Sequence, residues 1–300
     1  MGKSVLVIGS TCVDVIIRID HLPRTEENLH PKGQQVRMGG CAYNVANIVG
    51  RGGADTVFVT PVGLQGLFGP YLLPTLQSQP WCRPVVLKDV ENGCCYCLVE
   101  ASGERTFISV HGTEYTFSSD WMIPYENKRF DYTYVCGFEI EEESGEALSA
   151  WLEKSVSGTL MYAPGPHGAG IPRERTERLF RLRPILHLNE AEAMHMGEDD
   201  ALLKAMRNLH RQTQNAVIVT LGPDGAMVLD GQEEPLHLPA LPVPRVADTI
   251  GAGDAHAGAV LLALSRGRKL PDAVAFANRV AAQVVAQAGA TLEDDQILFS

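Results

Sequence analysis

The chain has 300 residues, 45% of them hydrophobic and 20% charged, which is the composition of an ordinary soluble globular protein. Its net charge of -11 disfavours binding to nucleic acid or to an anionic membrane surface, because both repel an acidic protein. The sequence contains no run of about 18 apolar residues, so a membrane-spanning helix is not expected.

The first strand-like segment, residues 5–9, begins almost at the N-terminus and is too short for a signal peptide. Seven cysteines occur along the chain, and three of them, Cys94, Cys95 and Cys97, lie close together. A zinc site would need further Cys or His ligands at suitable spacing, and the sequence supplies none. We therefore expect buried thiols on strands, in a cytoplasmic protein.

Short β-branched runs alternate with helix-like segments along most of the chain. The predicted strands are residues 5–9, 56–60, 132–136, 159–162, 185–188 and 216–221. The predicted helices between them are residues 42–50, 71–77, 144–155, 173–181 and 201–212. This alternation predicts a mostly parallel central sheet with helices on both faces. Ligands of such sheets bind beyond the carboxyl ends of the strands.

Two segments, about 13–38 and 84–111, interrupt this alternation and are rich in strand-forming residues. The second contains a Ser-Gly-Glu turn at residues 102–104, which predicts a β-hairpin over residues 90–109. We expect both segments to build a small β-sheet lid inserted in a single domain that spans residues 1–300. The alternative is an edge extension without a role in the site.

The most informative segment, residues 248–254, reads Asp-Thr-Ile-Gly-Ala-Gly-Asp and precedes an apolar run of helical length. The small residues Gly251, Ala252 and Gly253 let backbone approach a ligand, and a helix N-terminus binds anions. Asp254 places a carboxylate inside this anion site. A carboxylate there can remove a proton from a hydroxyl while the N–H groups stabilise a transferring phosphoryl group. The simpler alternative is that Asp254 is a helix cap.

A second motif lies near the N-terminus, where Gly39 and Gly40 precede Asn44 at the start of a predicted helix. The two motifs resemble the two signatures of the ribokinase family of sugar kinases, the phosphofructokinase-B type, and they occur in the family's order. The resemblance extends over nearly all of the chain. It implies a ribokinase-like three-layer α/β/α sandwich, ATP as phosphoryl donor, Mg²⁺ as cofactor, and dimers that pair through the lid.

The resemblance also implies roles for individual residues. Asp254 is the expected catalytic base, with the N–H groups of Gly251, Ala252 and Gly253 as the anion site. The residues expected to bind the sugar are Asp14, Gly39, Gly40, Asn44 and Glu139. The residues expected to bind ATP are Asn189, Thr220, Gly222, Gly225 and Asn278.

Two metal sites follow from the same resemblance. Glu192 forms an Asn-x-x-Glu motif with Asn189 and is expected to hold Mg²⁺ through water, since Mg²⁺ keeps several waters in its shell. Asp248, the Ile250 carbonyl and carbonyls around Ala288 resemble a site for a monovalent cation, usually potassium. The need for K⁺ stays open at this stage.

Several assignments have simpler alternatives. Asp14 could be a turn former after a strand, and Asn189 could cap a helix with an acidic first turn. The three acidic residues after Glu139 could replace it. Residues 63–69 lack an Asp that the family often has, and His256 stands where many members have Phe. His256 is expected to be either a packed core histidine or part of the substrate pocket.

The predicted function is an ATP-dependent carbohydrate kinase that phosphorylates a primary hydroxyl of an unphosphorylated sugar. A nucleoside kinase of the same family is the nearest alternative, and a non-catalytic sugar-binding regulatory protein is an alternative of another class. Asp254 argues against the latter, because a sensor has no use for a base. Only Arg37 and Arg105 on the lid could clamp a phosphorylated acceptor, which favours a neutral one.

Overall fold

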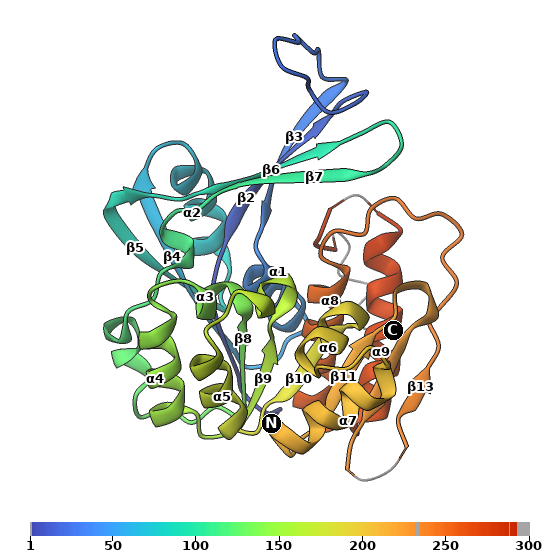
Figure 1. The fold of residues 1–300 in the computed structure, drawn as a ribbon. Helices are drawn as coiled ribbons and strands as arrows, with labels where there is room; N and C mark the ends of the chain where they lie inside the picture. The colour runs from blue at the N-terminus through green and yellow to red at the C-terminus, as the bar shows by residue number, and fades with distance from the viewer. Residues whose placement is uncertain (1, 232–233, 288, 293–300) are drawn as a thin grey trace.

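The computed structural model describes residues 2–231, 234–287 and 289–292, and within them the strands form two sheets (Figure 1). The larger sheet has nine strands in the order β13-β12-β11-β10-β9-β8-β1-β4-β5. These strands are β1 (Val5–Ile8), β4 (Thr56–Gln65), β5 (Cys82–Glu91), β8 (Tyr132–Cys136), β9 (Thr159–Ala163), β10 (Ile185–Asn189), β11 (Val217–Thr220), β12 (Ala226–Leu229) and β13 (Leu236–Leu238). The pairs β11–β12 and β12–β13, at one edge of the sheet, are antiparallel. All the other neighbouring strands pair in parallel.

Helices cover both faces of this sheet (Figure 1). Because successive strand residues point to opposite faces, Val5 and Val7 of β1 pack in one core cluster, and Leu6 and Ile8 in the other. The first cluster includes residues of α1 (Cys41–Arg51), α2 (Phe68–Ser78), α8 (Ala252–Ser265) and α9 (Leu270–Val285). The second includes residues of α4 (Gly145–Ser155), α5 (Arg173–Arg181), α6 (Glu190–Met196) and α7 (Leu202–Thr213). The expected three-layer arrangement is confirmed.

The remaining helical segments are short, and they are α3 (Gly137–Glu141), η1 (Thr113–Tyr115), η2 (Ser119–Tyr125), η3 (Gly165–Ala169) and η4 (Gly222–Asp224). Among the described residues, no helix is both long and apolar enough to cross a membrane.

The smaller sheet has four strands in the order β3-β2-β6-β7 and stands apart from the layers of the main body (Figure 1). Its strands are β2 (Cys12–Arg18), β3 (Gly33–Gly39), β6 (Cys94–Val99) and β7 (Arg105–Val110). β2 follows directly on β1, and β3 leads directly into α1. The small sheet is therefore attached at the carboxyl end of β1, where ligands of parallel sheets bind.

Residues 84–91, which the sequence assigned to the small sheet, lie instead in β5 of the large sheet. The reason is the length of β4, which continues to Gln65 rather than ending at Thr60. This extension gives Val85 and Val86 parallel partners in Pro61 and Val62. The predicted hairpin also starts later, because β6 begins at Cys94.

A buried polar network fixes the point where β6 and β7 leave the main body. Glu114 is fully buried, and its carboxylate accepts hydrogen bonds from the backbone N–H groups of Gly93 (2.8 Å) and Gly112 (3.0 Å). Asn92 donates to the same carboxylate (3.2 Å) and accepts from the N–H of Gly63 (2.7 Å). A buried carboxylate that accepts several backbone N–H bonds holds those segments in a single arrangement.

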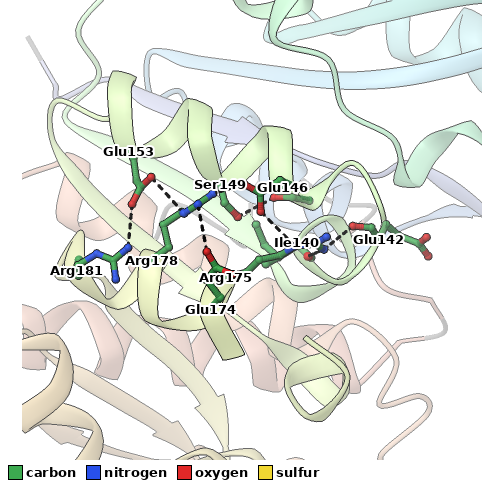
Figure 2. Close-up of polar contacts among 10 residues, drawn as sticks. Ile140, Glu142, Glu146, Ser149, Glu153, Glu174, Arg175, Arg178 and Arg181 are labelled. Carbon is green, nitrogen blue, oxygen red and sulfur yellow. Dashed lines mark hydrogen bonds and ion pairs between the residues drawn. The ribbon is translucent and has the colours of Figure 1, made fainter. Parts of the chain in front are cut away.

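A second polar network, on the outer face, ties α4 to α5 (Figure 2). Arg178 contacts the carboxylates of Glu146 (2.5 Å) and Glu153 (3.3 Å). Arg175 donates to the carbonyl of Ile140 (2.7 Å) and to the carbonyls of the next two residues (2.9 and 2.7 Å). Arg175 thus satisfies carbonyls at the end of α3, a position where cations are favourable.

Candidate active site

One cavity joins five of the predicted site residues, which are Asn189, Glu192, Thr220, Gly253 and Asp254. It lies at the carboxyl ends of β8, β10 and β11, beside the starts of α1 and α8. Its lining includes Cys41, Cys136, Asn189, Glu192, Thr220 and Asp254. The structure therefore places Asn189, Glu192 and Thr220 in one cavity with the predicted base, whereas Gly222, Gly225 and Asn278 do not line this cavity.

Asp254 lies in the first turn of α8 and connects the two glycine motifs. Asn44, buried on α1, donates from Nδ2 to Asp254 Oδ2 over 2.8 Å, although the two residues are 210 positions apart. Burial raises the pKa of Asp254 to about 6, and the hydrogen bonds from Asn44 and Cys41 oppose this rise. The nearby carboxylates of Asp14 and Glu139 add to it. A carboxylate with such a pKa is a suitable general base near neutral pH.

The raised pKa predicts an acidic limb in the rate profile. Asp254 must be ionised to accept a proton, so kcat/KM should fall about tenfold per pH unit below pH 6. Burial also raises the pKa of Asp14 to about 6, and the two groups interact, so the limb reports both carboxylates together. Initial rates between pH 4.5 and 8 at low acceptor concentration measure it. A profile that stays flat down to pH 5 would contradict a base with this pKa.

The start of α8 has the geometry of an anion site. Gly251 adopts φ +72°, and a Cβ at this position would lie 2.3 Å from the Cβ of Ala290, so only glycine fits. The first N–H groups of a helix have no partners within the helix. Gly253 is exposed and lines the cavity beside Asp254. These N–H groups can therefore face a phosphoryl group next to the base.

Asp14 lies on β2, in the small sheet, and packs against the first glycine motif. A Cβ on Gly39 would lie 2.1 Å from Asp14 Oδ2, so the absence of a side chain at Gly39 makes room for the carboxylate. Gly40 adopts φ +103°, with Ser10 O only 2.7 Å from where its Cβ would be. Both glycines are thus required by the close approach of β2 and of the residues that connect it to β1.

Glu139 is placed differently from the other predicted sugar-binding residues. Only 1% of its surface is exposed. Its Oε1 accepts from the backbone N–H of Ser10 (2.7 Å), and its Oε2 accepts from the thiol of Cys136 (2.8 Å). In this arrangement Glu139 joins the segment after β1 to the end of β8 beneath the cavity.

Asn189 and Glu192 form a capping box at the start of α6. Asn189 Oδ1 accepts from the Glu192 N–H (2.9 Å), and the Glu192 carboxylate accepts from the Asn189 N–H (2.9 Å) and side-chain amide (2.7 Å). Asn189 therefore does cap the helix, as the simpler alternative proposed. The hydrogen bonds of this cap also hold both side chains at the cavity. Among the described residues, no cluster of three or more His, Cys, Asp or Glu side chains could hold a metal. A single carboxylate suits Mg²⁺ that takes its other ligands from water and phosphate.

Thr220, at the end of β11, lines the cavity, and the turn that follows contains two glycines in left-handed backbone conformations. Gly222 has φ +59° and Gly225 has φ +96°. A Cβ on Gly225 would lie 2.2 Å from the carbonyl of Leu238, so this glycine lets the turn pack on β13.

Asn278 holds the chain segment that follows β13. Its Nδ2 donates to the carbonyls of Leu238 (2.9 Å) and Pro239 (3.2 Å), and its Oδ1 lies 3.1 Å from His256 Nε2. His256 Nδ1 in turn lies 2.8 Å from Nε2 of His187. The side chain of Asn278 thus supports the connector into the catalytic loop.

The proton positions in the hydrogen-bonded series His187–His256–Asn278 follow from the acceptor at its end, the side-chain oxygen of Asn278. The carbonyl oxygen of Asn278 can only accept, so His256 Nε2 carries a proton and neutral His256 accepts from His187 through Nδ1. Burial lowers the pKa of His256 to about 4 and also lowers the pKa of His187, which keeps both rings neutral. His256 is thus a packed core histidine. His187 was not predicted, because an isolated histidine in an apolar strand gives no sequence signal.

Asp248, predicted to bind a monovalent cation, has three hydrogen-bond and ion-pair partners within the described part of the protein. Oδ1 accepts from the Ile250 N–H (2.9 Å) and from Arg105 Nη2 (2.8 Å), and Oδ2 accepts from the Gly289 N–H (3.3 Å). The carbonyl expected from Ala288 lies outside the described residues. The predicted monovalent-cation residue is therefore paired with an arginine of the small sheet.

Comparisons with known proteins identify the family of the chain. The family model of pfkB family carbohydrate kinases matches residues 2–296. The uncharacterized sugar kinase YegV of Escherichia coli (strain K12) is 34% identical over 291 residues, which cover 96% of this chain and 90% of that protein. The adenosine kinase from Sinorhizobium meliloti has a TM-score of 0.84 and 21% identity, covering 99% of this chain and 98% of its own.

An Arabidopsis thaliana ribokinase complexed with ribose and ATP has the same fold, with a TM-score of 0.78 and 20% identity over 99% of this chain and 98% of its own. Fold and matches together define a phosphotransferase that acts on hydroxyl groups. The chain belongs to the pfkB family of carbohydrate kinases over nearly its whole length.

Proposed function

We propose that the protein is an ATP-dependent kinase that transfers the γ-phosphate of ATP to a primary hydroxyl of an unphosphorylated sugar. The observation that carries this proposal is the position of Asp254. Its carboxylate accepts from Asn44 at 2.8 Å, and it lies in the first turn of the helix whose N-terminus is the predicted anion site. A base and an anion site at one place suit transfer of a phosphoryl group to a hydroxyl.

In this reaction, Asp14 and Asn44 orient the acceptor through its hydroxyls. Asp254 takes the proton from the reacting hydroxyl, whose oxygen forms the new bond to the γ-phosphorus. The bond from that phosphorus to the bridging oxygen breaks, and ADP leaves with the electron pair. The N–H groups at the start of α8 stabilise the charge of the transferring group. Bound magnesium would neutralise part of the phosphate charge. Glu192 and Asn189 would hold the magnesium ion through water.

The acceptor side of the site is acidic, which supports a neutral acceptor. Asp14, Asp248 and Asp254 lie close enough for charge on one to raise the pKa of another. Arg105, one of two cations that could have bound a phosphorylated sugar, is instead paired with Asp248. A phosphate on the acceptor would meet these carboxylates, while Arg105 is already engaged by one of them.

The substrate class is tested by measuring ADP release with a panel of pentoses, hexoses, nucleosides and sugar phosphates, each with ATP and Mg²⁺. We expect an unphosphorylated sugar to give the highest kcat/KM, and we expect EDTA to abolish turnover. A nucleoside as the best acceptor would support the related nucleoside kinase instead. A sugar phosphate as the best acceptor, or full activity in EDTA, would contradict the proposal.

The small sheet provides a surface for pairing two copies of the chain. Phe107, Ile108 and Val110 on its edge strand β7 are each more than half exposed, and they lie close together on one strand. We propose that the protein acts as a homodimer paired through this sheet, in the cytoplasm, where ATP is available. Each small sheet would then also act as the lid of its own site.

A further inference from the structure

Arg105 connects the small sheet directly to the catalytic loop. It is the first residue of β7, and the β6–β7 hairpin extends over the C-terminal part of the chain (Figure 1). Its Nη2 lies 2.8 Å from Asp248 Oδ1, and its Nη1 donates to Thr249 Oγ1 over 3.1 Å. The side chains of Arg105 and Asp248 are 21% and 9% exposed. An ion pair this shielded from water is a stronger contact than a surface pair.

Asp248 organises the loop that carries the anion site. Its two oxygens accept from the N–H groups of Ile250 and Gly289, so the carboxylate joins the start of the loop to the segment after α9. Ile250 immediately precedes Gly251, the N-cap of α8. The carboxylate of Asp248 also lies near that of Asp14. A cation at Asp248 therefore offsets negative charge beside the place where phosphate must enter.

Arg105 contacts the carboxylate that was expected to hold a monovalent cation. Asp248 Oδ1 already accepts two hydrogen bonds, one of them from the guanidinium. A potassium ion on the same carboxylate would lie next to the positive charge of Arg105, and like charges at that distance repel. The donor set at Asp248 thus fits a guanidinium better than a metal ion.

We propose that Arg105 replaces the monovalent cation of this site: the small sheet, acting as a lid, delivers the positive charge that holds Asp248 and the catalytic loop in place. Arg105 is a positioning residue, because it acts through Asp248 and Thr249. The inference rests on the proposed kinase reaction. It implies that the loop is fully ordered only when the lid is closed, which couples phosphoryl transfer to closure.

The test compares the wild type, Arg105→Ala and Arg105→Lys in potassium, sodium and tetramethylammonium chloride at constant ionic strength. The wild type should show equal rates in all three salts. Arg105→Ala should lose about 10- to 100-fold in kcat, the range for a lost hydrogen bond between charged groups. It should also gain a preference for potassium over sodium and be partly restored by guanidinium ion, with Arg105→Lys intermediate. Arg18→Ala, on an exposed residue of β2 in the same sheet, is the matched control and should behave as the wild type.

A second measurement does not depend on turnover. The melting temperature of the wild type should be the same in potassium and in sodium, whereas that of Arg105→Ala should be higher in potassium. The inference is overturned if the wild type prefers potassium in either measurement, or if Arg105→Ala shows neither a cation preference nor rescue by guanidinium. A failure of the kinase proposal itself would give a different result: the wild type would release no ADP with any acceptor.

Discussion

Replacing Asp254 with asparagine should lower kcat about 10²-fold or more, while the affinity for ATP stays nearly unchanged. Asparagine keeps the shape of the side chain and can still contact Asn44, but it cannot accept the proton of the acceptor hydroxyl. The measurements are kcat on the best acceptor and calorimetric titration with an ATP analogue. Asp272→Asn is the matched control, because Asp272 is an exposed acidic residue in the first turn of α9.

The same substitution should not destabilise the fold at neutral pH. The pKa of Asp254 is raised to about 6 in the folded protein, so the fold favours the protonated carboxyl. The stability from this group is fully present below about pH 3.8, its ordinary pKa, and is lost as the pH rises through 6. Asparagine stays neutral, so Asp254→Asn should melt at the same temperature as the wild type or higher at pH 8. Near wild-type kcat in a folded Asp254→Asn variant would show that another group is the base.

Replacing Asp14 with alanine should lower kcat/KM for the acceptor by about 10²-fold or more and leave the KM for ATP unchanged. Asp14 lies on the small sheet, packed against Gly39, and it does not line the cavity to which Asn189 and Thr220 contribute. A site built to pair hydroxyl groups loses much of its selectivity when one partner is removed. Steady-state kinetics with each substrate varied in turn separate the two effects.

Asp20→Ala is the control for this experiment, because Asp20 is an exposed residue just beyond the end of the same strand. It should leave both KM values unchanged. If Asp14→Ala instead raised the KM for ATP and spared the acceptor, Asp14 would belong to the nucleotide side, and the assignment of the two sides of the site would be wrong.

The sequence predicted the central sheet because its parallel strands are buried on both faces and read as short apolar runs. The start of α8 was predictable for a similar reason: the glycines of residues 251–253 and the helix that follows are local features. The extent of β4 was not predictable, because a strand can be lengthened by a partner that lies far away in the sequence. Because β5 pairs with this longer β4, residues 84–91 belong to the large sheet.

Side-chain partners at long range were the least predictable part of the site. Glu139 was predicted from its place after a strand, but its hydrogen bonds to Ser10 and Cys136 depend on how β1 and β8 pack. The contact between Arg105 and Asp248 depends on where the small sheet lies over the catalytic loop. No local pattern contains that information, whereas the capping box of Asn189 could be predicted from residues three positions apart.

The most direct test of the central claim is to identify the product formed from ATP and the best acceptor. Wild-type protein, ATP, Mg²⁺ and that acceptor are followed by phosphorus NMR until the reaction stops. We expect ADP and a new phosphomonoester to form in equal amounts, and the phosphorus of the ester to couple to the protons of a CH₂ group. ADP with inorganic phosphate alone, or an ester on a secondary hydroxyl, would contradict transfer to a primary hydroxyl by this site.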